Sequence, residues 1–359
     1  MTESFDPGAL RQWWPKPSKP RPIVIFGAGS IVGDAHLPAY RKAGFPVAGI
    51  YDPDHAKAAA LAERWHIHAF ESEADALSVQ EAIFDLATPP AAHAAILGRL
   101  PIGAATLIQK PMGSDLAAAT AILEICRTRK LKAAVNFQLR FAPIMLALKD
   151  AIAKGHLGEV VDFDAWLALS TPWGLWPFLK GLPRIEIAMH SIHYLDLVRG
   201  LLGNPQGVHA KSIGHPNHDV AQTRTAAILD YGDRVRCVLS VNHDHDFGRK
   251  FQACEFRISG TSGAAYVKLG VNLDYPKGEP DELWIRPTGG SDWVAVPLEG
   301  AWFPDAFANR MANLQRFVTG EDNELIGSVE DAWQTMALVE AAYQSSAAPA
   351  TAIAPLPGQ

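Results

Sequence analysis

The chain has 359 residues, of which 48% are hydrophobic and 19% are charged, and its formal net charge is −6. A prior of roughly 150 residues per domain predicts two folded domains, and the composition excludes an intrinsically disordered chain. The acidic balance gives no reason to expect nucleic acid as a partner, because polyanion binding needs a concentrated basic face.

The cysteines and the first residues indicate the cellular compartment. Cys126, Cys237 and Cys254 lie far apart with no CxxC spacing. This argues against a zinc site or a disulfide framework and for a reducing compartment. The start, MTESFDPG, lacks the basic and apolar regions of a signal peptide, and no stretch approaches the ~18 apolar residues of a membrane helix. We therefore expect a cytoplasmic protein without a membrane partner.

The first expected element is an N-terminal arm over residues 1–20, because the adjoining segment LRQWWPKPSKPRP is too rich in proline for a helix interior or a central strand. In residues 21–140, the short β-rich runs PIVIF, PVAGIY, EAIFDLA, AATLIQK and KAAVNF alternate with helical stretches such as DHAKAAALAERWH and SDLAAATAILEICRTRK. This alternation predicts βαβ units on a parallel sheet.

The pattern changes in residues 141–346, which are expected to form a second domain. One helical segment, 184–202, precedes the alternating runs AQTRTAAILDYG, RVRCVLSVNHD, CEFRISG, AAYVKLG and DELWIRP. These runs predict a mostly antiparallel sheet. Two helical segments, DAFANRMANLQRFVTG and SVEDAWQTMALVEAAYQSS, close the domain, and residues 347–359 are a tail. The predicted fold class is α/β, with an α+β second domain.

The run PIVIFGAGSIVGDAHLPAY places glycines between the first strand and a helix. Gly27 would permit the tight turn, and Gly29 would let the backbone approach a pyrophosphate at the helix N-terminus. The third glycine of the dinucleotide motif G-x-G-x-x-G is replaced by Val32, and Gly33 comes one residue late. The alternative is a glycine turn that serves packing alone.

An acid at the end of the second strand strengthens the nucleotide interpretation. Asp52 lies in VAGIYDPD, about where a carboxylate binds the ribose diol of the adenosine. Its neighbours Pro53 and Asp54 carry no positive charge, so a 2′-phosphate would be repelled. The sequence therefore favours NAD over NADP.

Six segments together resemble the Gfo/Idh/MocA oxidoreductases: the glycine loop with HLPAY, then DLATPPAAHAAIL, QKPM, VNFQLRFAP, HYLDLVRGLLG and SVEDAWQTMALVEAAYQSSA. The similarity runs from Ile23 to Ser346. It implies a Rossmann domain followed by a domain with a large open sheet, which commonly mediates homodimers or homotetramers. It also implies tightly held NAD(P) and reversible hydride transfer at a sugar or polyol carbon.

The family's E-K-P motif falls on Gln109, Lys110 and Pro111. A lysine at the carboxyl end of a parallel strand stands at the crevice where ligands bind, and the following proline holds it extended. The resemblance implies that Lys110 bridges the nicotinamide ribose and the reacting hydroxyl, where its charge offsets a developing alkoxide. Gln109 keeps hydrogen bonding but loses a negative charge. The Lys–Pro bond is expected to be cis.

With these family positions, the expected cofactor-binding set follows the ends of the first-domain strands. It consists of Gly27, Gly29, Ser30, Ile31, Asp52, Thr88, Pro89, His93, Gln109, Lys110 and Gln138. His36 is expected to be structural.

The segment IEIAMHSIHYLD, residues 185–196, carries two histidines three residues apart. Aligned through HYLDLVRGLLG, the family motif D-x-G-x-H-x-x-D puts its histidine at His193 and its last aspartate at Asp196, with Met189 in place of the first aspartate. A second register would use Glu186 and His190 and would lose the trailing aspartate.

In a regular helix, Glu186, Met189, His190, His193 and Asp196 would share one face, opposite an apolar one. The alternative interpretation of this face is a solvated stripe. Because imidazole can take a hydroxyl proton near neutral pH, we expect His193 to be the catalytic base and Lys110 its electrostatic partner. His190 and Glu186 are expected to hydrogen-bond the substrate or to orient the base.

Three further side chains are substrate-binding candidates. Trp173 and Trp176 would form apolar walls for sugar C–H faces or anchor their own loop, and Arg140 would contact the substrate. In a strand, the run NHDHD (242–246) would split its histidines and acids between two faces, so no metal site is expected.

The sequence thus predicts an NAD-dependent dehydrogenase of a small sugar or polyol, such as a cyclic aldose of the pentose or apiose type that is oxidised to its lactone. Two alternatives stay open: a non-catalytic NAD-binding regulator, and a glycosidase- or dehydratase-type member that retains NAD.

Overall fold

The first half of the chain builds a five-stranded parallel sheet in the order β2-β1-β3-β4-β5, in a computed structural model that describes residues 5–175, 179–274 and 277–354. The strands are β1 (Ile23–Phe26), β2 (Val47–Tyr51), β3 (Ile83–Leu86), β4 (Ala105–Ile108) and β5 (Lys132–Val135). All five lie on the β-rich runs that the sequence singles out. β1, β3 and β4 are buried along their whole length, as expected for a parallel sheet covered on both faces.

Helices follow these strands in the expected alternation. They are α1 (Leu37–Ala43), preceded by a π-helical turn (Val32–His36), and α2 (His55–Trp65), α3 (Glu73–Leu77), α4 (Pro90–Leu97) and α5 (Leu116–Thr128). Side chains cap several of them: Asp54 accepts the amide of Lys57, and Asp115 accepts the amide of Ala118. The parallel βαβ arrangement predicted for this half is confirmed.

The second half forms an eight-stranded sheet in the order β13-β12-β11-β10-β6-β9-β8-β7. β6 and β9 pair in parallel and the other neighbours pair antiparallel, so the prediction of a mostly antiparallel sheet is confirmed. Its strands are β6 (Val160–Ala168), β7 (Gly207–Ile213), β8 (Arg224–Asp230), β9 (Arg236–Asn242), β10 (Ala253–Gly260), β11 (Ala264–Lys268), β12 (Glu282–Arg286) and β13 (Val294–Ala295).

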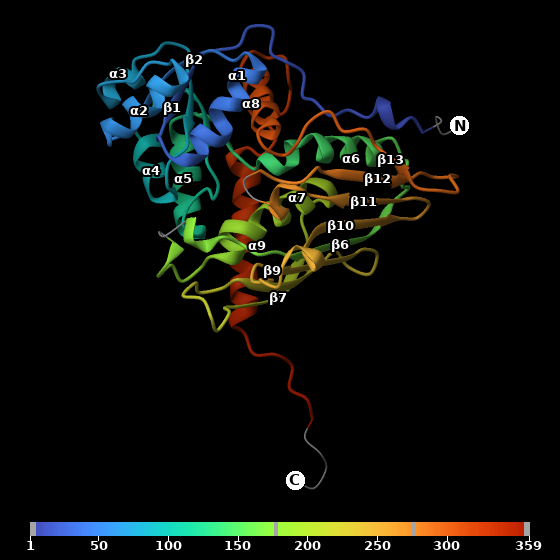
Figure 1. Ribbon diagram of the computed structural model, residues 1–359. Helices are drawn as coiled ribbons and strands as arrows, with labels where there is room; N and C mark the ends of the chain where they lie inside the picture. Colours follow the sequence, from blue (N-terminus) through green and yellow to red (C-terminus); the bar gives the residue numbers. More distant parts are fainter. Residues whose placement is uncertain (1–4, 176–178, 275–276, 355–359) are drawn as a thin grey trace.

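One face of this sheet packs on helices and the other is open. The helices are α6 (Pro143–Ala153), α7 (Ile192–Leu202) with a π-helical segment before it (Glu186–Ser191), and α9 (Val329–Ala347). Figure 1 shows α9 between the two sheets, and it contacts both β5 and β7. Alternate residues of the strands point to the open face, among them Trp166, Ile228 and Trp284, which are 40%, 51% and 37% exposed.

The helix α8 (Asp305–Val318) belongs to the first sheet, although it comes late in the sequence. Its side chains Phe307, Met311 and Leu314 share a buried cluster with residues of β1 and α1, and Figure 1 shows α8 beside α1. The core of the nucleotide-binding half is thus completed by a helix that begins 164 residues after the predicted division at residue 141.

The N-terminal arm is bound to the same region. Trp14 donates its main-chain amide to Asn309 Oδ1 at 2.9 Å and its indole Nε1 to Asp322 Oδ2 at 2.6 Å. Further along, the Arg21 amide donates to Gln315 Oε1 at 2.8 Å. The proline-rich segment is extended as expected, and its hydrogen bonds attach it to α8 and to the turn that follows α8.

Candidate functional site

The turn after β1 has the geometry of a nucleotide-binding loop. Gly27 has a φ of +103°, and a Cβ there would lie 2.4 Å from the carbonyl oxygen of Ala87, so only glycine fits. Around Gly29, a Cβ would meet no atom within 4 Å, which leaves space beside the backbone. Val32 begins the π-helical turn and is buried, and Gly33 lets Leu61 of α2 come close. Ser30 is exposed on the same loop.

Asp52 joins the end of β2 to this loop. Its two carboxylate oxygens accept the amides of Ala28 and Asp54, each at 2.8 Å. These bonds fix a negative charge at the rim of the glycine loop, and each oxygen keeps a lone pair for a hydroxyl donor. A fixed carboxylate at this position favours a ribose diol and repels a 2′-phosphate.

Buried polar atoms without partners gather at the carboxyl ends of the strands. Thr88 Oγ1 after β3, both amide atoms of Asn136 after β5, and Gln138 Oε1 have no hydrogen-bond partner in the described parts of the chain. Because buried polar atoms normally have hydrogen-bond partners, these unpaired atoms indicate a bound ligand or water. The hydroxyls, phosphates and carboxamide of NAD supply matching donors and acceptors. Thr88 and Pro89 follow the carboxyl end of β3, and Gln138, which follows β5, lines a cavity.

His93, expected to bind the cofactor, is placed differently. Its ring is buried in α4, where Nε2 lies 3.0 Å from the carbonyl of Thr88 and Nδ1 lies 3.3 Å from that of Met112. Burial lowers its pKa. His93 thus links the loops after β3 and β4, and both of its ring nitrogens face main-chain carbonyls.

Gln109 links the site to a buried pair beneath it. His36 Nδ1 lies 2.7 Å from Asp85 Oδ2, which also accepts from Tyr40 Oη at 2.7 Å. The other ring nitrogen of His36 faces Gln109 Nε2 at 3.3 Å, and Gln109 Oε1 accepts the amide of Lys110 at 2.9 Å. His36 is structural, as expected. A glutamine suits this position because its amide can donate to the ring nitrogen, whereas a glutamate would add a second acid beside Asp85.

A cavity of about 290 Å³ lies at the carboxyl ends of β4 and β5, between the two halves of the chain. Its polar wall comes from the QKP segment, the π-helical segment with α7, and the end of β9, and its apolar wall comes from loops of the second half. The lining residues are Ile31, Gln109, Lys110, Gln138, Leu169, Ser170, Thr171, Pro172, Leu179, Met189, His190, His193, Tyr194, His243, Val271, Asn272, Trp302 and Phe303.

Lys110 stands at the junction of the two halves. Its Nζ donates to the carbonyl oxygen of Met189 at 2.9 Å, and the Lys110–Pro111 peptide is cis, as the family resemblance implies. Burial lowers the pKa of Lys110 to about 8, because a desolvated ammonium loses much of its hydration. The lysine is therefore cationic at neutral pH and close to its titration point.

Both histidines of the IEIAMHSIHYLD segment line this cavity. His193 is 8% exposed and packs edge-on against Trp302, with ring centroids 5.6 Å apart. Burial first, and then the charge of Lys110, hold the pKa of His193 well below its usual range. The pKa of His190 is also lowered well below its usual range by burial, with further contributions from His243, Lys110 and His193.

The π-helical segment explains why these side chains converge. A π turn is wider than an α turn, and it spans Glu186–Ser191 immediately before α7. Met189, His190 and His193 consequently face the cavity together with Tyr194, whereas Glu186 and Asp196 do not. The regular helix expected over 184–202, with all five candidate side chains on one face, is thus corrected.

Glu186, expected to bind the substrate, is fully buried behind the cavity wall. One carboxylate oxygen accepts from Ser191 Oγ at 2.7 Å and lies 3.3 Å from His243 Nε2, and the other accepts from the Thr225 hydroxyl. Its role is therefore to orient His243. The only sequence signal for His243 is its place in the NHDHD run. Its ring lies 4.6 Å from that of His190, centroid to centroid.

The tryptophan-rich loop supports these rings from outside. Trp173 packs edge-on against His190 and His243, with centroids 5.5 and 5.6 Å apart, and its Nε1 donates to Asp244 Oδ1 at 3.2 Å. It anchors the loop, which was one of the two roles expected for it. Trp176, its expected partner, lies outside the described residues.

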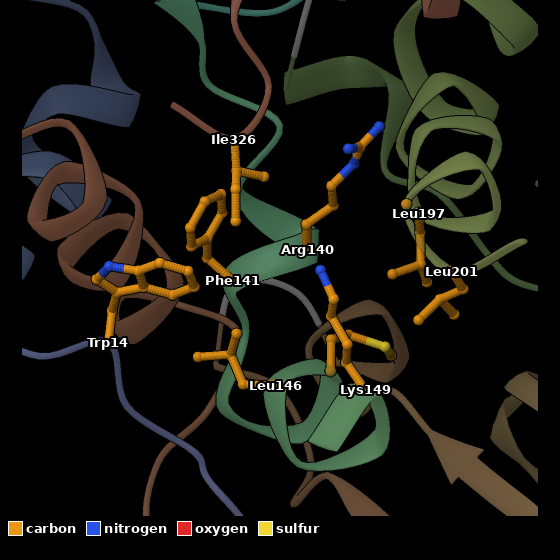
Figure 2. A pocket seen from close by; sticks show the side chains of 10 residues that line it. Trp14, Arg140, Phe141, Leu146, Lys149, Leu197, Leu201 and Ile326 are labelled. Atoms are coloured by element: carbon orange, nitrogen blue, oxygen red, sulfur yellow. The ribbon is translucent and has the colours of Figure 1, made fainter. Parts of the chain in front are cut away.

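Arg140, expected to contact the substrate, instead binds two helices of the second half. Its guanidinium makes a bidentate pair with Asp196 of α7, with Nε–Oδ2 at 2.5 Å and Nη2–Oδ1 at 2.7 Å. Its Nη1 also donates to Asp331 of α9 at 2.8 Å. Figure 2 shows the Arg140 side chain beside a separate small pocket with Lys149 and Leu197. The expected role is therefore corrected to that of a structural clamp.

The loops that close the cavity from the second half could not be singled out from the sequence. Asn272, whose Nδ2 donates to Tyr194 Oη at 3.2 Å, and the pair Trp302–Phe303 lie far along the chain from any recognised motif. Only the tertiary fold brings them to the histidines.

Within the described ranges, no three His, Cys, Asp or Glu side chains are grouped so as to hold a metal ion. The described helices include none that combines the length and the apolar character needed to span a membrane.

The chain matches two family models. One, described as "Oxidoreductase family, NAD-binding Rossmann fold", covers residues 21–137, and the other, described as "GFO/IDH/MocA C-terminal domain", covers residues 145–266. The fold and the site define an oxidoreductase that binds NAD through a Rossmann domain. The chain belongs to the GFO/IDH/MocA family.

Relatives and solved structures agree with this assignment. Inositol 2-dehydrogenase of Rhizobium meliloti is 32% identical over 345 residues, which cover 90% of this chain and 96% of that protein. D-apiose dehydrogenase of Paraburkholderia graminis is 24% identical over 323 residues, with coverages of 87% and 84%. An oxidoreductase from Agrobacterium radiobacter, crystallised with NAD+, L-tartaric acid and magnesium, has the same fold, with a TM-score of 0.75, 20% identity and coverages of 92% and 97%.

The Arg140 clamp yields a stability prediction. In the Arg140→Met variant, Asp196 stays buried without its partner, so we expect the free energy of unfolding to fall by about 3 kcal/mol, as measured by chemical denaturation. The exposed pair Arg127–Glu330 provides the control, because Arg127→Met should cost less than about 1 kcal/mol. Equal losses in the two variants would contradict the role of Arg140.

Proposed function

We propose that the protein is an NAD-dependent dehydrogenase that oxidises a hydroxyl group of a small sugar or polyol. The observation that carries the proposal is the meeting of Lys110 and His193, contributed by different halves of the chain, on the wall of one cavity. That cavity opens at the carboxyl ends of the parallel strands, where ligands of such sheets bind.

The lysine and the histidine have complementary tasks in this reaction. NAD, when bound, supplies the acceptor for the hydride that leaves the carbinol carbon. Lys110 would hold the substrate oxygen and offset the negative charge that develops on it. His193 would accept the hydroxyl proton, and its lowered pKa keeps the ring unprotonated at neutral pH before the reaction.

The remaining polar groups of the wall would position the substrate. His190 faces the same space, and its Nδ1 is buried with no hydrogen-bond partner among the described residues. His243 is oriented by Glu186 on one side and by Thr171 Oγ1, 2.8 Å from its Nδ1, on the other. Asn272 and Tyr194 add an amide and a hydroxyl across the cavity.

The relatives support a ring hydroxyl as the site of oxidation. One is named for inositol and another for D-apiose, and the sequence-based interpretation of a pentose-type aldose oxidised to its lactone is of this kind. The retained Lys110 and His193 favour a dehydrogenase over a non-catalytic NAD-binding regulator, and an NAD-retaining glycosidase or dehydratase is distinguished by its products. The cytoplasmic location stays a prediction, in keeping with three free, buried cysteines.

We also propose that the open face of the eight-stranded sheet joins copies of this chain into a homodimer or homotetramer. Trp166, Ile228 and Trp284 stand on this face, partly exposed, on three different strands. Large apolar side chains gathered on one face of a sheet are typical of a protein interface.

The function is tested by supplying purified protein with a panel of aldoses and polyols, with NAD and NADP in parallel, and following absorbance at 340 nm. We expect reduction of NAD, and a preference for NADP would overturn the role of Asp52. His193→Ala should lower kcat by about 10²-fold or more, the loss typical of a general base, and His190→Ala should lower it less.

The reverse order of these two variants would assign the base to His190. A complete absence of turnover across the panel would favour the regulator. Formation of a dehydrated or hydrolysed product without net NADH would favour the NAD-retaining glycosidase or dehydratase.

The pH profile tests the charge state of Lys110. If its cation stabilises the alkoxide, kcat/KM for the substrate should be level near neutral pH and fall above about pH 8, where Lys110 loses its proton. The acid limb should lie well below pH 6.5, because His193 is protonated only there. In Lys110→Arg the guanidinium keeps its charge, so the alkaline fall should disappear even if the rate is lower. A rate that rises through pH 8 would make Lys110 itself the proton acceptor.

The oligomer proposal predicts the effect of a charge on the open face. Ile228→Glu should shift the sedimentation coefficient to that of a smaller species, because an unpaired carboxylate would be buried in the interface. Ile102, which is 74% exposed on a turn of the first domain, is the matched control, and Ile102→Glu should leave sedimentation unchanged. An unchanged coefficient for Ile228→Glu would argue against this interface.

A further inference from the structure

The described residues that line the cavity include basic groups but no acid, and of these basic groups His243 is paired with Glu186 behind the wall. Its titratable side chains include Lys110, His190, His193 and His243, and none of its described lining residues is an aspartate or a glutamate. At neutral pH a positive charge in the cavity comes from Lys110, whereas burial favours the unprotonated form of His190 and His193. A cleft with an uncompensated positive charge attracts anionic ligands, and a neutral sugar would leave that charge without a counter-ion.

The carboxylates behind the wall are all bound to other groups. Glu186 is held by Ser191, Thr225 and His243, and Asp196 is paired with Arg140. Near the end of β9, Asp244 accepts from Thr223 and Trp173 and lies 3.5 Å from His218, and the more exposed Asp246 accepts from Ser170. Their charges are therefore taken up outside the cavity.

The lysine has only a neutral partner. Lys110 Nζ donates to a main-chain carbonyl, that of Met189, and makes no ion pair with a carboxylate among the described residues. The side chain of Met189 is part of the same wall and adds no charge beside the ammonium. A partly buried ammonium without an anion is costly, and an incoming carboxylate would remove that cost.

A second anchor for an anion lies at the histidine pair. His190 and His243 face each other with centroids 4.6 Å apart, but only His243 has a carboxylate, Glu186, behind it. His190 Nδ1 is buried without a partner in the residues described. Burial lowers the pKa of Lys110, and burial followed by the neighbouring His243, Lys110 and His193 lowers the pKa of His190. A bound anion would stabilise the protonated form of both groups. The apolar side chains of Leu179, Val271 and Trp302 around them exclude water and strengthen such a pairing.

We infer that the substrate carries a carboxylate, so that it is a small polyhydroxy acid rather than a neutral sugar or polyol. His190 would donate to this carboxylate, and the Lys110 ammonium would attract it while also holding the reacting hydroxyl. The inference rests on the proposed dehydrogenase function and narrows its substrate class. A carboxylate is favoured over a phosphate ester because the cavity is small and no arginine is among its described lining residues.

The test compares matched pairs of equal carbon number and configuration, such as D-glucitol with D-gluconate and D-galactose with D-galacturonate. Each is offered to the NAD-loaded protein near pH 7, with the corresponding sugar phosphate as a third arm. We expect kcat/KM for the acid to exceed that for its neutral counterpart by about tenfold or more, the effect of one charge-assisted hydrogen bond. A preference for the neutral member or for the phosphate ester would overturn the carboxylate assignment.

At position 189, two variants of nearly the same shape, Met189→Asp and Met189→Asn, differ from each other in charge. In Met189→Asp, a fixed acid beside Lys110 should lower the acid-to-neutral ratio of kcat/KM by about tenfold. Met189→Asn, of nearly the same shape, should keep the ratio of the parent protein. Thermal unfolding of both variants shows whether each is folded, and equal ratios in the two variants would overturn the inference.

Binding measured by calorimetry on the NADH-loaded protein separates this inference from the function on which it rests. Oxidation of neutral polyols but not of acids would reject the carboxylate and keep the dehydrogenase. Tight binding of acids with no change at 340 nm would reject the dehydrogenase and keep the carboxylate. Failure of both classes to bind or react would reject both.

Discussion

The site depends on how α7 is held against the end of the parallel sheet, and Arg140 provides that constraint. Its guanidinium joins the segment after β5 to Asp196 in α7 and to Asp331 in α9. Asp196 lies one helical turn after His193, so the pair that anchors the helix also sets where the imidazole points. Arg199, one turn further on, binds Asp331 as well and completes the network. The position of His193 in the cavity wall thus depends on ion pairs whose residues are not among those that line the cavity.

The fold could be predicted largely from local patterns, because the β-rich runs and glycine turns of the first half act over short distances. β1 to β5 were identified in this way, as were β8 to β12. β6, the central strand that pairs with β9 and β10, was overlooked although Asp162, Asp164 and Trp166 alternate with buried residues along it. The placement of α8 could not be predicted, since no local pattern shows which sheet a late helix covers.

For the site, the residue types were easier to predict than their roles. Lys110, His190 and His193 were named from motifs, and all three line one cavity. Glu186, His93 and Arg140 are polar side chains in the right segments, yet tertiary contacts use up their hydrogen-bonding groups. A sequence shows that such a polar group exists, but it does not show which residue is its hydrogen-bond partner in the folded protein. His243, Asn272 and Trp302 join the wall only through the fold.

The return of α8 to the first sheet has a consequence for how the protein is made. Val32, Tyr40 and Ala35 bury their side chains in the cluster that Phe307 and Met311 complete. The nucleotide-binding half leaves the ribosome long before α8 does, so its apolar flank is uncovered for roughly half of translation. A fragment cut at the end of β5 would keep this apolar surface exposed permanently, and we expect it to aggregate more readily than the full chain.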